Sequence, residues 1–370
     1  MLPPNRGGGK STESVNLARN MLITLLFALL ALPSPDPIDQ LPQASVTVDR
    51  ERRELVIELP AIDLPAADGP DGMTMVEPPV CQAVLPISGW LVAYRVQVLD
   101  AAGRRLPQAM LHHFNLTDPA RRDLFAPLPL HMLAASKETP SVSVPWFVIG
   151  TPMMAGQRML ASGMAANHEP HAVRGVRLRL ILSYVPANRP WPLFAAYPWS
   201  MDVMFPLGQP TGGSKGFDLP PGRTEKSWES SPAIAGRIVG LSGHVHDYAQ
   251  SLELKDMTTG NVIWHAEPTR DSSGIVSAMP VARFYRWYRI GVRIHPSHRY
   301  RVTVVYDNPT GRVLPLGGMG AVAGLFVPAG GARWPQVDPA DTVYQRGLSI
   351  ELHKSGSSMT DMMMMEHHRH

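Results

Sequence analysis

Short stretches of alternating apolar and polar residues recur along this chain, each ended by a turn signal, and they limit its possible folds more than any other feature. Outside one apolar segment near the N-terminus, no helical periodicity continues for more than about ten residues. The chain contains 37 prolines, which disfavour long helices because proline lacks a backbone N–H donor. Strands joined by tight turns fit this pattern, so the sequence predicts an all-β protein.

The predicted strands form two groups, separated by a segment rich in Pro, Gly and Ser at residues 206–232. Each group can supply two packed antiparallel sheets, so we expect two β-sandwich, jelly-roll-like domains. The first is predicted at 45–205 and the second at 215–353, with 1–44 and 354–370 outside them. The stretches interpreted as strands are 44–60, 89–107, 157–167, 176–186, 236–248, 251–266, 288–294, 299–311 and 320–328.

The composition narrows the class of protein. Hydrophobic residues make up 44% of the chain and charged residues 18%, which is typical of a packed core rather than global disorder. The formal net charge is +3 and no basic run is interleaved with aromatic residues, so we expect no nucleic-acid partner. Cys81 is the single cysteine, which excludes a disulfide within the chain and a cysteine-based zinc site. We expect Cys81 to be a small buried apolar residue.

The N-terminal segment predicts export. Lys10 and Arg19 precede a predominantly apolar stretch of twelve residues at 21–32, and a Pro-Ser-Pro break follows. This arrangement is typical of a secretory signal, whereas spanning a bilayer needs about 20 apolar residues. We therefore expect an extracytoplasmic protein, periplasmic or secreted. Membrane anchoring through an uncleaved 21–32 segment is the alternative.

Two histidine pairs and one methionine are the best candidates for a metal site. His112 and His113 are adjacent, whereas His244 and His246 are separated by one residue. Residues i and i+2 of a strand point to the same face, so His244 and His246 can bind one metal ion. Met319 lies between glycines, which allow close approach of the backbone. Two imidazoles and a thioether form a soft donor set that suits copper.

In order and spacing, these residues resemble the copper type II, ascorbate-dependent monooxygenases, the family of peptidylglycine alpha-hydroxylating monooxygenase and dopamine beta-hydroxylase. His113 and His244 are 131 positions apart, and His246 and Met319 are 73 apart, similar to the family's gaps. The resemblance covers roughly residues 45–353. The phrases LHHFNLTDPARRDLF and YDNPTG…GGMG are closest to a bacterial branch of the family.

The resemblance implies a copper ion in each of two β-sandwiches, with ascorbate or a similar reductant. His244, His246 and Met319 would form the oxygen-activating site, and His112 and His113 would belong to the electron-supplying site. The implied reaction is hydroxylation of a C–H bond of a small-molecule or peptide substrate with dioxygen. The disulfides of the animal enzymes are absent.

The electron-supplying site departs from the family pattern, which has a third histidine on a later strand. The stretch that aligns with it is MLASGMAANHEPH. Met164 lies nearest the expected position, with His168 and His171 just beyond. The third ligand is therefore Met164, His168 or missing, and the presence of this second copper stays open.

Two other functions remain as alternatives. A non-catalytic extracytoplasmic copper-binding protein would fit the incomplete first site and the tail SMTDMMMMEHHRH, whose thioethers and imidazoles suit copper. The same tail is typical of a disordered terminus. A calcineurin-like metallophosphoesterase would explain GHVH and the ANHEP at 166–170, but it needs an α/β sandwich and an Asp-x-His motif, which this chain lacks.

Other residues carry weaker predictions. Asp247 could accept a hydrogen bond from a histidine ligand, or serve as an ordinary turn carboxylate. Glu138 is near the first copper site only by the resemblance. Four aromatic residues fit either a substrate cleft or the core: Trp264, Tyr285, Trp287 and Tyr288. Five further histidines have no spacing that predicts a partner: His131, His265, His295, His298 and His353.

Overall fold

The structure is a computed structural model that describes residues 36–67, 74–137, 139–206, 215–272, 274–286, 289–330 and 332–353. The predicted export segment, Glu138, Trp287, Tyr288 and the Met/His tail lie outside the described residues. Residues 1–40 and 41–370 form separate compact units. In the first, the structure describes one 3-10 helix, η1 (Pro37–Gln40). Within the described residues, no helix has the length and apolar content needed to cross a membrane.

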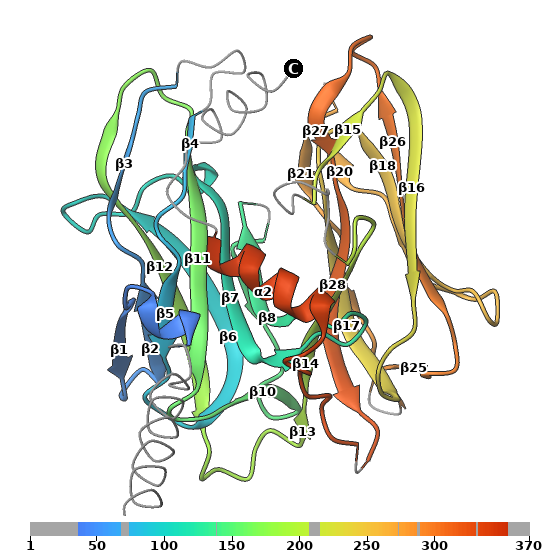
Figure 1. Cartoon of the computed structure of the whole chain (residues 1–370), viewed down its shortest axis with the longest axis horizontal. Coiled ribbons are helices and arrows are strands. Elements are labelled where there is room, and N and C mark those ends of the chain that lie inside the picture. The colour runs from blue at the N-terminus through green and yellow to red at the C-terminus, as the bar shows by residue number, and fades with distance from the viewer. Residues whose placement is uncertain are drawn as a thin grey trace, which may run out of the picture. The chain divides into compact units, whose positions relative to one another are not determined.

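The prediction of an all-β fold is confirmed: sheets that are almost entirely antiparallel build most of the described part of the chain beyond residue 40 (Figure 1). One sheet has the order β1-β2-β12-β6-β10-β13, with β3 on β12 and β9 on β6. In this sheet only β10 and β13 pair in parallel. Its strands are β1 (Ser45–Asp49), β2 (Glu54–Glu58), β3 (Ile62–Leu64), β6 (Gly89–Leu99), β9 (Ser141–Ser143), β10 (Ile149–Met153), β12 (Val173–Pro186) and β13 (Phe194–Ala195).

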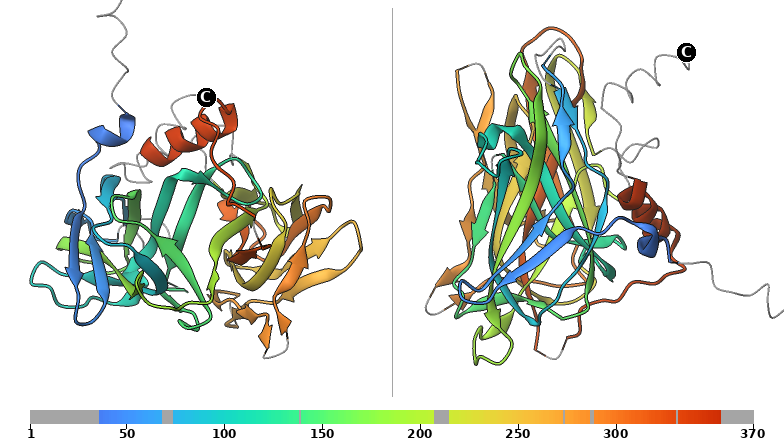
Figure 2. Two further views of the ribbon diagram at one scale, coloured as in Figure 1. Left: turned by 90° about the horizontal axis from the view of Figure 1, so that it is seen from below. Right: turned by 90° about the vertical axis from the view of Figure 1, so that its left-hand side faces the viewer.

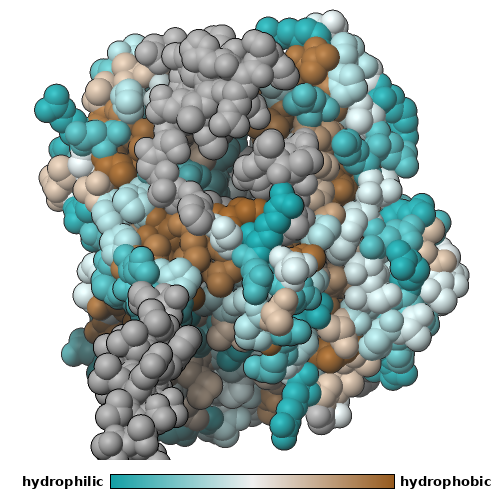
Figure 3. Space-filling model, in the orientation of Figure 1, coloured by the Kyte–Doolittle hydropathy of each residue, from teal (hydrophilic) through white to brown (hydrophobic). Residues whose placement is uncertain are grey.

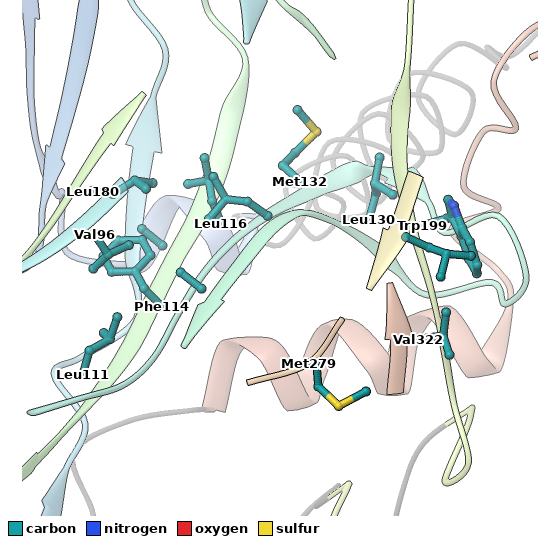
Figure 4. Packing of buried hydrophobic residues seen from close by; sticks show 14 of the residues in the cluster. Val96, Leu111, Phe114, Leu116, Leu130, Met132, Leu180, Trp199, Met279 and Val322 are labelled. Atoms are coloured by element: carbon teal, nitrogen blue, oxygen red, sulfur yellow. The ribbon is translucent and has the colours of Figure 1, made fainter. Parts of the chain in front are cut away.

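A second sheet packs on the first and has the order β4-β11-β7-β8, with β5 on β11. Gly163 of β11 lies so close to the other sheet that a Cβ there would be 2.8 Å from Leu178 Cδ1. Figure 4 shows Phe114 of this sheet beside Val96 and Leu180 of the first. Its strands are β4 (Thr74–Val76), β5 (Cys81–Val84), β7 (Leu111–Arg122), β8 (Pro129–Ser136) and β11 (Arg158–Asn167). A 3-10 turn, η2 (Gln108–Met110), precedes β7.

The second sandwich also consists of two sheets. The first has the order β14-β28-β17-β22, with β25 on β17, and the second has the order β16-β26-β18-β19. These strands are β14 (Tyr197–Asp202), β16 (Gly222–Ser230), β17 (Gly236–Val245), β18 (Ala249–Asp256), β19 (Val262–Ala266), β22 (Ala282–Arg283), β25 (Val292–Ile294), β26 (Tyr300–Asn308) and β28 (Gly320–Pro328). Three small pairs complete it: β15 (Phe217–Leu219) with β27 (Leu314–Gly318), β20 (Thr269–Arg270) with β21 (Val276–Ala278), and β23 (Tyr285–Arg286) with β24 (Arg289–Ile290).

The alternation in β26 explains how one strand builds this core. Tyr300, Val302, Val304 and Tyr306 are all buried, because every second residue of a strand faces the same side. Opposite them, Gly243 of β17 leaves no room for a side chain, since its Cβ would lie 2.2 Å from Leu252 Cδ2 of β18. Tight packing between the two sheets therefore depends on glycine in β17.

The two groups of strands share one continuous apolar core. Trp199 of β14 is 2% exposed, and its ring centroid lies 5.3 Å from that of Phe125 in the β7–β8 loop. Phe125 in turn is 6.0 Å from Tyr300 of β26. β14, which precedes the predicted boundary between the domains, pairs with β28, which follows it. The exact division into domains stays a prediction.

Outside the sheets, the described residues contain one regular α-helix, α2 (Thr342–His353), which the sequence pattern had not indicated. Figures 1 and 2 show it beside the strands rather than between them. Its contacts are to β7 and the β7–β8 region: Tyr344 donates a hydrogen bond of 2.7 Å to the Pro119 carbonyl, and Glu351 lies 3.3 Å from His131. Figure 3 shows apolar residues gathered near the centre of the same face, in the region of β11.

Cys81 lies in β5 and is fully buried, as expected for a small apolar residue. Burial raises the pKa of its thiol to about 11. A thiol in this state is a poor metal ligand and a poor nucleophile, because both roles need the thiolate.

Burial of Asp202, at the end of β14, predicts a pH-dependent stability. Desolvation raises the pKa of its carboxyl to about 6, although Lys215 and the Met204 N–H act against the shift. The folded protein therefore keeps this proton over a pH range in which the unfolded chain has lost it. Stability falls as pH rises through that range, with about 1 kcal/mol of the loss between pH 5 and 7.

The variant Asp202→Asn tests this dependence. Asparagine keeps an acceptor for the Met204 N–H, which lies 2.8 Å from Asp202 Oδ1, but cannot ionise. Denaturant unfolding at pH 5 and pH 7 is expected to show a smaller loss of stability in the variant than in the parent protein. Equal losses in the two proteins would contradict a raised pKa at this position.

Candidate metal centre

The second histidine pair lies where β17 ends. His244 belongs to β17, and His246 follows the last residue of that strand. Val245, between them, is 3% exposed and faces the core, so alternation directs both imidazoles to the opposite face. The two ring centroids are 5.4 Å apart, with an interplanar angle of 84°. Both side chains are half-buried.

The register of β28 against β17 brings Met319 to the same place. β28 lies beside β17 (Figure 1). His244 pairs with Ala321 and Val245 with Gly320, so one further step would place Met319 opposite His246. Gly320 is directed at the core, since a Cβ there would lie 2.6 Å from Val304 Cβ. Continued alternation then directs Met319 to the face of the two histidines. Its side chain is half-buried rather than enclosed in the core.

The hydroxyl of one tyrosine, Tyr306, bonds to the backbone of both His246 and Met319. Tyr306 Oη accepts hydrogen bonds of 2.9 Å from the backbone N–H of His246 and from that of Met319. It also donates to the Met319 carbonyl. Tyr306 itself belongs to β26 in the facing sheet, and burial raises the pKa of its hydroxyl. The sequence did not reveal this role, although Tyr306 falls on the buried face of the predicted strand at 299–311.

Glycines on both sides of Met319 make this approach possible, as the sequence suggested. A Cβ on Gly318 would lie 2.3 Å from Phe217 Cε2, and one on Gly320 would collide with Val304. The Phe217 ring packs edge-on against Tyr306, with centroids 5.9 Å apart. Close packing, and not an unusual backbone angle, therefore explains why these positions are glycine.

The adjacent histidines His112 and His113 share a face because of a β-bulge. Met164 of β11 pairs with His113, but the next residue, Ala165, pairs with Leu111, so His112 is the extra residue. Without a bulge, adjacent residues of a strand would point to opposite faces. Here Leu111 and Phe114 are both fully buried on the core side. The imidazole centroids are 5.4 Å apart, with an interplanar angle of 59°.

The pairing of β11 with β7 distinguishes the candidates for a third ligand beside His112 and His113. Met164 lies directly opposite His113 and is 7% exposed. His168 and His171 are both exposed and follow the end of β11. His168 is four residues beyond Met164, which is about 13 Å along an extended strand. The register therefore places Met164, and not His168, beside the histidine pair.

A carboxylate accompanies this first pair. Glu77 follows β4, and its Oε1 lies 3.9 Å from His113 Nε2. An anionic group near an imidazole favours a bound cation. Nothing in the sequence pattern indicated Glu77, because β4 pairs with β11 only through tertiary folding.

The other candidates have ordinary structural partners. Trp264 of β19 is 8% exposed in the core, and Tyr285 of β23 is half-buried. Asp247 accepts a hydrogen bond of 3.0 Å from the Val276 N–H, as a turn carboxylate does. Three further histidines also have partners: His265 contacts Glu253 at 3.3 Å, His298 contacts Asp256 at 2.8 Å, and the His295 N–H donates to Tyr300 Oη at 3.0 Å. Nothing is described of the His353 side chain.

In the part of the chain that the structure describes, no group of three or more His, Cys, Asp and Glu side chains is arranged to hold a metal ion. The two candidate sites are of another kind, since each has two imidazoles and one thioether. Such a donor set favours soft metal ions, copper above all, over zinc or magnesium.

No protein-family model and no curated protein matches the chain. Among solved structures, 75% of the chain is similar to the whole major capsid protein P2 of bacteriophage PM2, with 10% identity and a TM-score of 0.34. A structure from Sulfolobus turreted icosahedral virus matches 80% of this chain and 96% of its own, with 11% identity and a TM-score of 0.27. The structure of PNGF-II is similar over 80% of this chain and 62% of the PNGF-II chain, with 8% identity and a TM-score of 0.24.

These similarities are too low to support an argument about function. The sheets of the protein itself show its fold class, which is all-β with antiparallel β-sandwiches.

Proposed function

We propose that this protein is an extracytoplasmic, copper-dependent monooxygenase that hydroxylates a C–H bond of a small-molecule or peptide substrate. Dioxygen and ascorbate or a similar reductant would be its co-substrates. The observation that supports this most is the register of β17 and β28, which brings Met319 to His244 and His246 from 73 positions beyond His246. Copper bound there would supply the redox chemistry that dioxygen needs.

The chain's own contribution would be the geometry of the donors. The end of β17 would set the spacing of the imidazoles, and the glycine-flanked position between β27 and β28 would set that of the sulfur. The second set, His112, His113 and Met164, would hold the electron-supplying copper. The all-β fold also differs from the α/β sandwich that the metallophosphoesterase alternative requires.

The parent protein provides the direct test. The protein is expected to bind one or two equivalents of copper. The copper-loaded form is expected to consume oxygen when ascorbate and a substrate are added. Bound copper without ascorbate-driven oxygen uptake would favour the non-catalytic copper-binding alternative. Failure to bind copper would exclude both proposals.

The variant Met319→Ala separates the role of the sulfur from that of the imidazoles. The two histidines are expected to keep much of the copper, because a thioether is a weak ligand, while oxygen uptake falls by about tenfold or more. X-ray absorption should show the loss of a copper–sulfur contact. Met154→Ala is the matched control, since Met154 is 61% exposed and lies outside both sites. An unchanged sulfur signal and unchanged turnover in Met319→Ala would contradict this assignment.

A further inference from the structure

The hydroxyl of Tyr306 makes every hydrogen bond available to a phenol. It accepts two, from the N–H groups of His246 and Met319, and donates one to the Met319 carbonyl. A phenolic oxygen has one proton and two lone pairs, so this set is complete. The side chain is fully buried, and its ring packs against Phe217. The group therefore has one orientation and no spare hydrogen-bonding capacity.

The bonds have a direct effect on the ladder between β17 and β28. Continued pairing would put Met319 opposite His246, where the two backbones could bond to each other. Both N–H groups are instead bound to one oxygen, which comes from β26 in the facing sheet. The phenol therefore replaces the direct backbone pairing of His246 with Met319, and it holds these two residues next to each other.

We propose that Tyr306 is a positioning residue, which places the Met319 thioether relative to the His244–His246 pair. This inference rests on the proposed function, because the placement matters for copper. Because its oxygen is already bonded to three backbone groups, the phenol would not be a ligand of copper bound here. It acts through the two backbone segments that carry the ligands. Its removal would loosen Met319 from His246, whereas His244 would stay on β17.

The variant Tyr306→Phe tests the proposal, since it keeps the ring and removes only the oxygen. It is expected to bind copper through the imidazoles but to lose the Met319 contribution to the copper–sulfur signal in X-ray absorption, with oxygen uptake reduced about 10–100-fold. In the metal-free protein, hydrogen exchange at the amides of His246 and Met319 is expected to speed up. A variant that keeps the sulfur contact and slow exchange at both amides would overturn the proposal.

Tyr300→Phe provides a matched control. Tyr300 belongs to the same strand, is equally buried, and its hydroxyl accepts a hydrogen bond of 3.0 Å from the His295 N–H. Its removal is expected to speed exchange at His295 while leaving His246, Met319 and the copper–sulfur contact unchanged. Loss of the sulfur contact in Tyr300→Phe as well would show a general effect of a lost buried hydroxyl, which would overturn a specific role for Tyr306.

Two further measurements keep the test decisive. The double variant Tyr306→Phe with Met319→Ala should be no less active than Met319→Ala alone, because both changes remove the same contact. If Tyr306→Phe does not fold, the metal-free parent protein still answers: the amides of His246 and Met319 should be protected, and rapid exchange there would overturn the proposal. A parent protein that shows protected amides but no copper–sulfur contact would refute the proposed function and leave the hydrogen bonds intact.

Discussion

Replacing His244 with alanine is expected to remove copper from the site at the end of β17 and to abolish oxygen uptake. His244 lies within β17 and pairs with Ala321 of β28, so the ladder holds the backbone that carries its imidazole. Without it, only His246 and a weak thioether remain, which is too few donors for a stable copper site. Loss of outer-shell contacts reduces metal affinity about 10–100-fold, and loss of a ligand should exceed this.

Copper titration followed by separation of free metal would measure the effect, with oxygen consumption recorded on the same samples. His265→Ala is the control, because His265 belongs to the same sandwich but its ring contacts Glu253 on the surface. The circular dichroism of both variants should match that of the parent. Full copper binding and full turnover in His244→Ala would remove the main support for the proposed function.

The variant Trp199→Ala is expected to lower the free energy of unfolding by about 3–5 kcal/mol, the cost of deleting a large buried aromatic side chain. Trp199 is 2% exposed, and Phe125 packs on it from the β7–β8 loop. Figure 4 shows it between Leu130 and Val322, which belong to β8 and β28. The change would therefore open a cavity where strands of both groups meet.

Denaturant unfolding would measure this loss, and Trp199→Phe is its control. Within the described residues the Trp199 indole N–H has no hydrogen-bond partner, so phenylalanine removes an unsatisfied donor while keeping most of the ring. We expect Trp199→Phe to cost much less than Trp199→Ala. Equal losses would show that the ring's packing is not what stabilises this region.

Local patterns in the sequence predicted several of the strands. They missed β7, β8 and β14, and the segment at 206–232, expected to be a loop between the two groups, contains β15 and β16. Alternation at 299–311 indicates β26 with Tyr300 and Tyr306 on one face, and that face is buried. The same rule indicates that His244 and His246 point the same way. These properties depend on a few neighbouring residues, which is why one sequence suffices to predict them. The helix α2 was missed because its twelve residues have only a weak amphipathic pattern.

The relation between distant segments could not be predicted in the same way. Whether Met164 or His168 lies beside His113 depends on the register of β11 against β7, which runs unbroken from the Leu160–Thr117 pair to the Met164–His113 pair. The pairing of β14 with β28 also joins strands more than 100 positions apart. Hydrophobic alternation is equally satisfied by several registers that differ by two residues, so side-chain packing between sheets must choose among them.

The sequence by itself therefore determined the all-β class, the buried faces of the strands, and the soft donors of the candidate copper sites. Only the tertiary structure decided that Met319 lies beside His246, that a bulge turns His112 and His113 to one face, and that Tyr306 ties two ligand-bearing segments together. The physical reason is the range of the interactions: alternation acts between adjacent residues, whereas register and the bonds of a buried phenol depend on groups that only folding brings into contact.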